Sequence, residues 1–362
     1  MKWSVEQDNA LLAVERWRTA GDTQLFRLFG YAGAGKTTMA RHIAENAGGE
    51  VAFAAFTGKA AHVMRQKGCV GASTIHSLIY RPASDEGDEG EPAFTIRHDA
   101  PASTADLIII DECSMVDEDL GRDLLSFGKP VLVLGDPAQL PPVKGGGYFT
   151  EGVPDFMLTE IHRQAADNPI IRLSMAIREG TEFDEQSDEC RILSRQEIST
   201  DAIMEADQIL VGANRTRKRY NDRLRELHGY TDPSPESGEK LVCLRNNKKK
   251  GLLNGGLWNV DRRMSPRGGR VRFSVRPEEG GKAVTVTVPR AFFTDGPENV
   301  PWTQRKGADE FDYGYALTVH KAQGSQWDNI VLFDESYMFR EHRARWLYTG
   351  VTRAAERLTL VR

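Results

Sequence analysis

Cysteine is scarce in this sequence, and long apolar runs are absent from it. The cysteines stand far apart along the 362 residues, at Cys69, Cys113, Cys190 and Cys243, and no two have a CxxC spacing. This spacing argues against a disulfide framework and against a cysteine-ligated zinc site. No apolar run approaches the roughly 20 residues that a membrane-spanning helix needs. No signal peptide is recognisable, so we expect a cytoplasmic location and no membrane partner.

An excess of positive charge is also missing from the chain as a whole. The formal net charge is −5, which by itself does not indicate a nucleic-acid binder. The distribution is uneven, because residues 236–306 carry 15 Lys or Arg and 7 Asp or Glu, a balance of +8. The rest of the chain therefore carries −13. This asymmetry indicates a segment that faces a polyanion or, alternatively, a solvated basic surface.

Apolar strand-like segments alternate with helix-like segments along much of the chain. The first half has such strands at 25–30, 51–56, 105–112 and 129–136, and another lies at 329–333. Continuous apolar strands separated by helices are typical of a parallel sheet covered on both faces. We therefore predict two α/β domains, the first formed by residues 1–81 and 105–150 and the second by residues 151–235 and 307–362.

Two segments interrupt this alternation. Residues 82–104 are acidic and rich in Pro, Gly and Ser, which indicates a small hairpin inserted in the first domain. Residues 236–306 hold short alternating runs between Gly, Asn and Pro clusters. This pattern predicts a small antiparallel β-barrel inserted in the second domain.

The stretch GYAGAGKTT, residues 30–38, fits the phosphate-loop pattern G-x-x-x-x-G-K-[ST] between a predicted strand and a predicted helix. Its backbone N–H groups and the helix N-terminus would bind phosphate oxygens. Lys36 would reach the β- and γ-phosphates, and the Thr37 hydroxyl would ligate Mg²⁺. The residues expected to contact the nucleotide are Gly33, Ala34, Gly35, Lys36, Thr37 and Thr38.

Polar side chains end two further predicted strands. Asp111 and Glu112 end strand 105–112, at the carboxyl edge where ligands bind in open α/β sheets. We expect Asp111 to hold Mg²⁺ through its water shell and Glu112 to deprotonate an attacking water. Gln139 follows Asp136 in a Pro-rich turn, where its amide would sense the γ-phosphate. A simple turn is the alternative for these residues.

Eight motifs, in their order along the chain, resemble those of the superfamily 1 helicases, most of all the RecD-like branch with the Dda-type phage helicases. The motifs are GYAGAGKTT, FTGKAA, STIHSLIY, IIIDECSMVD, LGDPAQLPPV, LTEIHRQ, ALTVHKAQGSQW and LYTGVTRAAERL. The resemblance implies two RecA-like P-loop NTPase domains, with ATP and Mg²⁺ as cofactors. It leaves out only the two insertions and the region 180–205.

The resemblance assigns nucleotide roles to further residues. Arg163 and Arg353 match two arginines that reach the γ-phosphate, where a planar, permanently charged guanidinium stabilises the transferring group. With Lys36, Glu112 and Gln139 they form the expected catalytic set. The remaining expected nucleotide contacts are Gln7, which would read the adenine edge, His162, which would stack on adenine, and Gln323. Gln7 on a helix surface and a structural His162 are the alternatives.

The resemblance also assigns residues to DNA. In the first domain these are Thr57, Lys59, Thr74 and His76, and in the second they are Thr318, His320, Gly324 and Ser325. Such contacts to sugar and phosphate position a strand without reading its sequence. The insertion 82–104 would be a pin with Phe94 as its wedge, or Phe94 would anchor the hairpin. The insertion 236–306 resembles an SH3-like barrel, whose Lys248, Lys249 and Lys250 would contact phosphates.

The resemblance implies a monomeric ATP-dependent DNA helicase that moves 5′→3′ on single strands in replication, recombination or repair. Its expected partners are single-stranded DNA and its junctions with duplex, with a single-strand-binding protein or a replisome component as a further candidate. The expected setting is a bacterial or phage-infected host cytoplasm. Two alternatives stay open, a superfamily 1 RNA helicase and a DNA-binding ATPase switch or scaffold without unwinding activity. A small-molecule kinase would not need the segment 318–327.

Overall fold

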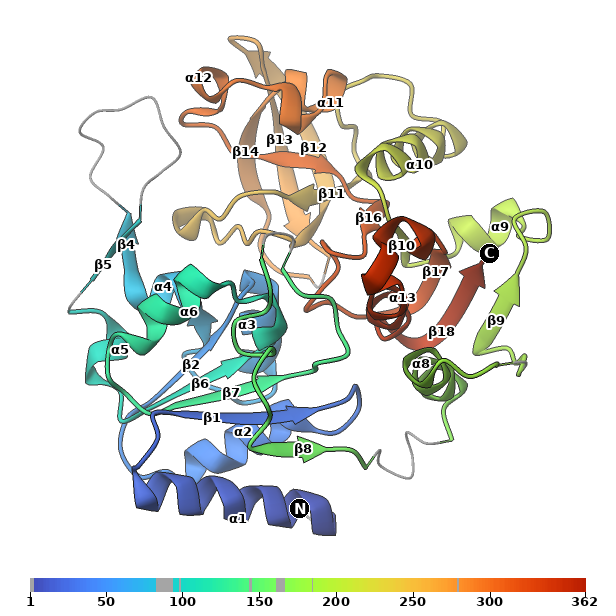
Figure 1. Ribbon diagram of the computed structural model, residues 1–362. Coiled ribbons are helices and arrows are strands. Elements are labelled where there is room, and N and C mark those ends of the chain that lie inside the picture. The colour runs from blue at the N-terminus through green and yellow to red at the C-terminus, as the bar shows by residue number, and fades with distance from the viewer. Residues whose placement is uncertain are drawn as a thin grey trace. The chain divides into compact units, whose positions relative to one another are not determined.

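The chain forms two compact units, Met1–Phe183 and Asp184–Arg362, each with its own sheets (Figure 1). The computed structural model describes residues 3–82, 94–97, 99–142, 145–160, 167–183, 185–278 and 280–362. In these ranges, no helix has the length and apolar character that crossing a membrane requires.

The first unit is built on a parallel sheet with the strand order β3-β2-β6-β7-β1-β8. The strands are β1 (Leu25–Gly30), β2 (Val51–Ala55), β3 (Ser73–Thr74), β6 (Leu107–Asp111), β7 (Val131–Gly135) and β8 (Phe156–Leu158). Every residue of β6 and β7 is buried, which explains their unbroken apolar sequences. The parallel α/β arrangement expected from the sequence is therefore confirmed.

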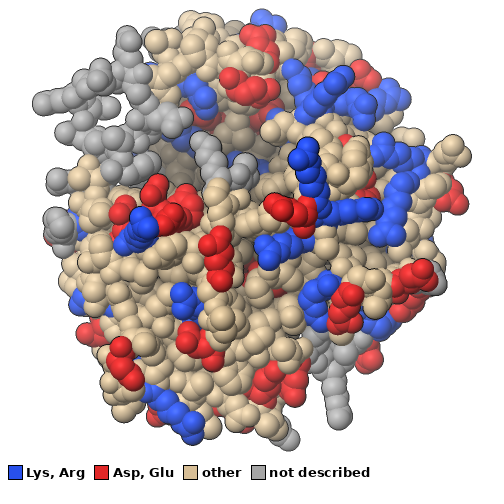
Figure 2. Space-filling view, in the orientation of Figure 1, with Lys and Arg blue, Asp and Glu red and all other residues tan. Residues whose placement is uncertain are grey.

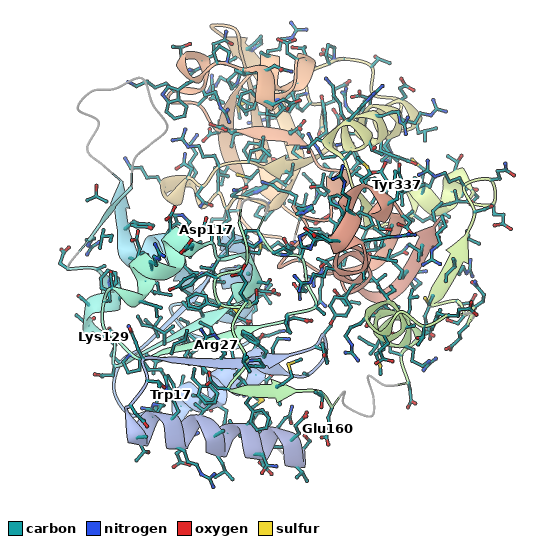
Figure 3. All side chains as sticks on the ribbon, in the orientation of Figure 1. Trp17, Arg27, Asp117, Lys129, Glu160 and Tyr337 are labelled. Atoms are coloured by element: carbon teal, nitrogen blue, oxygen red, sulfur yellow. The ribbon has the colours of Figure 1, made fainter. Side chains whose placement is uncertain are left out.

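Helices cover both faces of this sheet and create two apolar clusters. They are α1 (Val5–Ala20), α2 (Lys36–Glu45), α3 (Gly58–Gln66), α4 (Ile75–Ile79), α5 (Pro101–Thr104) and α6 (Glu118–Leu125). Helix α8 (Pro169–Glu179) follows near the end of the unit and contributes no described residue to these clusters. Ile109 of β6 lies in one cluster, whereas its neighbours Ile108 and Ile110 lie in the other, as strand geometry requires. Trp17 of α1, labelled in Figure 3, packs on Phe26 of β1 with ring centroids 5.3 Å apart.

The first unit extends further along the chain than the predicted limit of residue 150. Strand β8 pairs with β1, which places residues 156–158 in this unit, and the compact unit as a whole runs to Phe183. The predicted hairpin is shorter than residues 82–104, because Ala102 of α5 is buried in the core of the unit. The described part of the hairpin is the antiparallel pair β4 (Tyr80–Pro82) and β5 (Phe94–Ile96). Most of the predicted pin and the Phe94 side chain lie outside the described residues.

The second unit contains a parallel sheet with the order β16-β10-β17-β18-β9. Its strands are β9 (Cys190–Leu193), β10 (Gln208–Val211), β16 (Ala316–Thr318), β17 (Trp327–Phe333) and β18 (Ala354–Val361). The accompanying helices are α9 (Thr200–Met204), α10 (Asn214–Leu227), α13 (Arg343–Val351) and the 3-10 helix η4 (Ser336–His342). Trp327, the first residue of β17, is buried.

An antiparallel sheet is inserted in this unit, with the order β14-β13-β12-β11-β15. Its strands are β11 (Lys240–Cys243), β12 (Leu257–Arg267), β13 (Arg270–Pro277), β14 (Val284–Pro289) and β15 (Phe311–Tyr313), joined by the short helices η2 (Lys248–Lys250), α11 (Ala291–Thr294), η3 (Pro297–Asn299) and α12 (Trp302–Arg305). The sheet continues past the predicted limit of residue 306, because β15 pairs with β11. An SH3-like barrel stays a prediction.

Three polar residues on one face of α10 fasten the inserted sheet to the rest of the unit. Their spacing of four residues places Arg217, Asn221 and Arg225 above one another. Arg217 donates to Asp312 at 2.6 Å, and Arg225 donates to both oxygens of the fully buried Glu239 at 2.6 and 3.1 Å. Asn221 bonds the backbone on both sides of the β15–β16 connection. The entry and the exit of the insertion are thus held by a single helix.

Cys113 next to the acidic pair has a packing role that supports a prediction. A Cβ added at Gly135 would lie 2.5 Å from the Cys113 sulfur, which is too close. We expect Gly135→Ala to lower the free energy of unfolding by about 1–3 kcal/mol, the usual range for overpacking a core. Chemical denaturation would measure this. In a Cys113→Ala background the sulfur is gone, so an equally large decrease there would contradict the explanation.

Candidate nucleotide site and nucleic-acid interface

The phosphate loop connects β1 to α2 through two left-handed glycines. Gly33 and Gly35 have φ values of 82° and 79°, which side-chain-bearing residues rarely adopt. The buried Ala34 donates its N–H to the Tyr31 carbonyl, and Thr38 donates to the Gly35 carbonyl. Gly35 caps α2 without a side-chain hydrogen bond, so the helix N-terminus keeps backbone N–H groups for an anion.

Lys36 and Thr37 begin α2 and place a cation and a hydroxyl beside this loop. The Lys36 ammonium donates to the carbonyls of Gly30 and Tyr31, at 2.7 and 3.0 Å, and is thereby held against the loop. The Thr37 hydroxyl donates to the Asp111 carboxylate at 2.7 Å. A hydroxyl and a carboxylate are oxygen ligands of the kind that Mg²⁺ prefers. The donor set therefore fits the metal expected from the sequence.

Asp111 and Glu112 lie where β6 ends, as the sequence predicted. Asp111 is buried and accepts the backbone N–H of Glu112 at 2.8 Å. Glu112 itself has φ 54° and ψ 44°, a left-handed conformation that is uncommon for a glutamate. Backbone strain of this kind concentrates at functional sites, where the surrounding structure enforces it.

Gln139 follows β7, the strand that lies between β1 and β6 in the sheet. Its side chain is only 6% exposed, and its amide oxygen has no hydrogen-bond partner among the described residues. An unsatisfied buried amide oxygen costs free energy, and a water or a bound ligand would relieve this cost. The phosphate loop, the acidic pair and Gln139 thus follow three adjacent strands at one sheet edge.

Gln7 was predicted either to read the adenine edge or to lie on a helix surface. The structure excludes the surface position. Gln7 is buried, and its amide nitrogen donates to the carbonyl of Ala34 in the phosphate loop at 3.2 Å. Its amide oxygen accepts the N–H of Ser4 and completes a capping box. Gln7 therefore links the start of α1 to the loop, and adenine recognition by Gln7 stays a prediction. His162 and Arg163 lie outside the described residues.

The segment 318–327 forms a compact turn at the end of β16 in the second unit. The Thr318 hydroxyl accepts the N–H of Lys321 at 3.3 Å, and Gly324 is left-handed with φ 73°. Gln323 and Ser325 are buried. The His320 ring lies 5.3 Å from Phe339, and burial together with the charge of His342 lowers the pKa of His320. A neutral imidazole suits a hydrogen-bond donor rather than a cation.

Arg353 is bound to this turn inside the second unit. It is 4% exposed, and its guanidinium donates to the carbonyls of Ser325 and Thr349 at 3.2 and 3.0 Å. A second contact joins the Gln326 amide to the Thr352 carbonyl. The predicted DNA turn and the predicted catalytic arginine are therefore adjacent in the structure, although the role of Arg353 on a nucleotide stays a prediction.

The predicted DNA residues of the first unit lie at the ends of neighbouring strands. Thr57 follows β2 and caps α3, whereas Thr74 ends β3 and caps α4. Lys59 lies in the first turn of α3. His76 packs between Phe56 and Tyr80, and burial lowers its pKa although Asp117 acts in the opposite direction. The structure brings these residues to one edge and gives both threonines a capping role; their contacts with DNA stay predictions.

The lysines of the run 248–250 in the insertion differ in their surroundings. Lys249 is exposed, whereas Lys250 forms an ion pair with the buried Asp309 at 2.5 Å. The Lys248 side chain lies outside the described residues. Lys250 thus stabilises the insertion itself, so the free cation of this run is Lys249 within the described part of the chain.

An open cavity of about 350 Å³ lies beside Thr318, and sequence reasoning missed most of its polar lining. Besides Thr318, it is lined by Asn214, Arg217, Glu298, Arg305, Asp312 and Lys321. Lys321 forms no ion pair with a described residue and donates to Asn254 at 2.6 Å. Burial lowers the pKa of Lys321, and the nearby Arg217 acts in the same direction. An anion in the cavity would stabilise this desolvated charge.

Two family models match the chain. The first, described as an AAA domain, matches residues 4–195, more than half of the chain. The chain belongs to this AAA domain family. The second, described as a UvrD-like helicase C-terminal domain, matches residues 313–361, which include the segment 318–327 and Arg353.

Curated proteins of similar sequence indicate which helicase branch this chain resembles. The ATP-dependent RecD2 DNA helicase of Deinococcus radiodurans is 29% identical over 92% of this chain and 46% of its own length. The conjugal transfer protein TraA of Rhizobium radiobacter is 24% identical over 98% of this chain and 32% of its own length. The chain thus spans less than half the length of these curated relatives. With the AAA domain match, they support the RecD-like branch of superfamily 1.

Solved structures show the same fold. A Pif1 helicase studied in DNA unwinding at forked duplex DNA has a TM-score of 0.64 and 20% identity, over 99% of this chain and 92% of its own. A Bacteroides Pif1 in complex with ADP-AlF3 and single-stranded DNA has a TM-score of 0.60 and 18% identity, over 99% and 92%. At these identities the likeness establishes the fold of this family member.

The left-handed backbone at Glu112 leads to a stability prediction. Asparagine tolerates this conformation better than longer side chains do, whereas glutamine does not relieve it. We expect the free energy of unfolding of Glu112→Asn to exceed that of Glu112→Gln by about 0.5–1 kcal/mol. Both variants remove the carboxylate, so the comparison isolates the backbone. Equal stability in parallel urea titrations would rule out strain at this position.

Proposed function

We propose that this chain is an ATP-dependent motor that moves 5′→3′ along single-stranded DNA and unwinds duplex. The observation that carries the proposal is the meeting of three features at one sheet edge: a phosphate loop, a hydroxyl–carboxylate pair, and a buried amide whose oxygen has no partner among the described residues. Lys36 neutralises phosphate charge, and the backbone N–H groups at the start of α2 bind phosphate oxygens. Thr37 and Asp111 would hold Mg²⁺, which supplies further neutralisation of phosphate charge when bound.

Glu112 and Gln139 have complementary roles in the proposed hydrolysis. The Glu112 carboxylate accepts the proton of the water that attacks the γ-phosphate. The Gln139 amide oxygen, buried without a partner among the described residues, accepts a hydrogen bond from that water and orients it.

The second unit supplies the proposed contact with DNA. The carboxylates of Glu298 and Asp312 also line the cavity beside Thr318, and Asp312 is paired with Arg217. The groups left for an anion are the Thr318 hydroxyl, the Asn214 amide and the desolvated Lys321 ammonium. These groups suit a sugar–phosphate backbone, which carries one charge per nucleotide and is bound without reading bases. Arg353 is hydrogen-bonded to Ser325 of the same turn, so a strand that displaces this turn also displaces the arginine.

The choice of DNA as the substrate rests on the relatives. The Deinococcus radiodurans relative is named an ATP-dependent DNA helicase, and Pif1 structures contain single-stranded DNA. The 5′→3′ direction rests on the motif resemblance to the RecD-like branch. Replication, recombination and repair are the proposed settings, with a monomer as the working form. An RNA helicase and an ATPase switch without unwinding remain the competing functions.

The central prediction concerns ATP hydrolysis. We expect single-stranded DNA to raise the hydrolysis rate by at least tenfold, and Glu112→Gln to lower the stimulated rate about 100- to 10,000-fold, as removal of a general base does. Nucleotide binding by the variant, followed with a fluorescent ATP analogue, would be retained. Matched RNA and DNA strands, and duplexes with a 5′ or a 3′ tail, complete the assay. Stimulation by RNA alone, or unwinding of 3′-tailed duplexes only, would contradict the proposal.

The cavity gives a second prediction. Lys321→Met removes the charge and keeps the apolar stem, so we expect weaker binding of single-stranded DNA without a change in DNA-free ATP hydrolysis. The logarithmic salt dependence of binding should become shallower by about 0.7, the value for one phosphate of a single strand that is no longer neutralised. Fluorescence anisotropy would measure both. Lys129→Met is the control. Lys129 lies just before β7 in the first unit and does not line the cavity. Equal effects of the two variants would exclude a cavity role.

A further inference from the structure

Helix α10 carries a concentration of positive charge that the proposed nucleotide and cavity sites do not use. Its 14 residues include six Lys or Arg and two acids, a balance of +4 in a chain whose net charge is −5. Figure 2 shows Lys and Arg side chains gathered over this helix. Charge of this density on one exposed helix creates a strong local field.

The positive residues divide between two faces of α10. Arg217 and Arg225 face the inserted sheet and are paired with Asp312 and Glu239. The opposite face is exposed and lines an open hollow of about 410 Å³. The lining residues of this hollow, which we call the outer α10 face, are Arg215, Lys218, Arg219, Asp222, Arg223 and Glu226.

Most of the positive charge on the outer α10 face is not neutralised by ion pairs. Arg223 pairs with Glu226 at 2.9 Å, whereas Arg215, Lys218 and Arg219 form no ion pair with a described residue. Arg215 lies in the first turn of the helix, where the backbone dipole adds further positive potential. Residues three and four apart on a helix are about 5–6 Å from one another, so the three cations form a short charged row.

We propose that the outer α10 face binds the phosphate backbone of DNA that lies outside the cavity, such as the duplex arm of a fork. The hollow is lined by charged side chains alone. Protein-binding surfaces are depleted of charge at their centre and rely on aromatic or apolar anchors, whereas DNA-binding surfaces are polar and strongly positive. The lining therefore favours a nucleic-acid backbone over an acidic protein. The inference rests on the proposed function and deepens it.

The test compares a triple variant, Arg215→Gln with Lys218→Gln and Arg219→Gln, with a matched control. The control, Arg16→Gln with Lys67→Gln and Arg357→Gln, removes the same charge from exposed positions outside α10. Fluorescence anisotropy over a range of salt would follow two probes, a short oligothymidylate and a forked duplex with the same single strand. Circular dichroism and thermal unfolding would show that each variant is folded.

We expect the triple variant to bind the oligothymidylate normally and the fork more weakly. The logarithmic salt dependence for the fork should fall by about 0.9 for each phosphate that is no longer neutralised, roughly 2–3 in total. Unchanged binding of the fork would overturn the inference and leave an acidic protein as the candidate partner. Equally weakened fork binding by the control variant would also overturn it. Failure of the unmodified chain to bind either probe would instead refute the proposed function.

Discussion

The 2.7 Å hydrogen bond between Thr37 and Asp111 joins the two halves of the proposed nucleotide site. It connects the first turn of α2 to the end of β6, across the position of β7 in the sheet. Because parallel strands end at one edge, this single contact fixes the distance between the phosphate loop and the acidic pair. Gln139, which follows β7, is thereby placed between them, and the strained backbone of Glu112 is held beside a buried carboxylate.

The second unit achieves its proposed role with desolvated cations rather than with a large net charge. Arg353 is almost fully buried, and within the described part of the chain its guanidinium donates to two carbonyls and one hydroxyl, all neutral groups. Burial lowers the pKa of Lys321 as well. Charges that are largely kept from water and form no ion pair with a described residue bind an anion more strongly than solvated ones. This explains how a chain with a net charge of −5 remains compatible with a polyanionic partner.

The sequence predicted the features that depend on local order. A phosphate loop between a strand and a helix, and acids at a strand end, are specified by short motifs, and the structure has them in place. Features that depend on distant contacts were missed. The β15–β11 pairing moved the end of the insertion past residue 306, and the burial of Gln7 follows from packing against the loop. The positive φ of Glu112 has no signal in residue type, since glutamate rarely adopts it.

The fastening of the inserted sheet by α10 has a mechanical consequence. Both the entry and the exit of the insertion are held by side chains of α10, namely Arg217, Asn221 and Arg225. A force on the insertion would therefore act on these side chains more than on the two backbone connections. A force on the inserted sheet would pass through these side chains, which lie on three successive turns of α10, and through this helix to the parallel sheet. The buried Arg225–Glu239 pair resists such loading most, because separating it would leave two charges in a low-dielectric interior. We therefore expect the insertion to move together with α10 as one rigid body within the second unit.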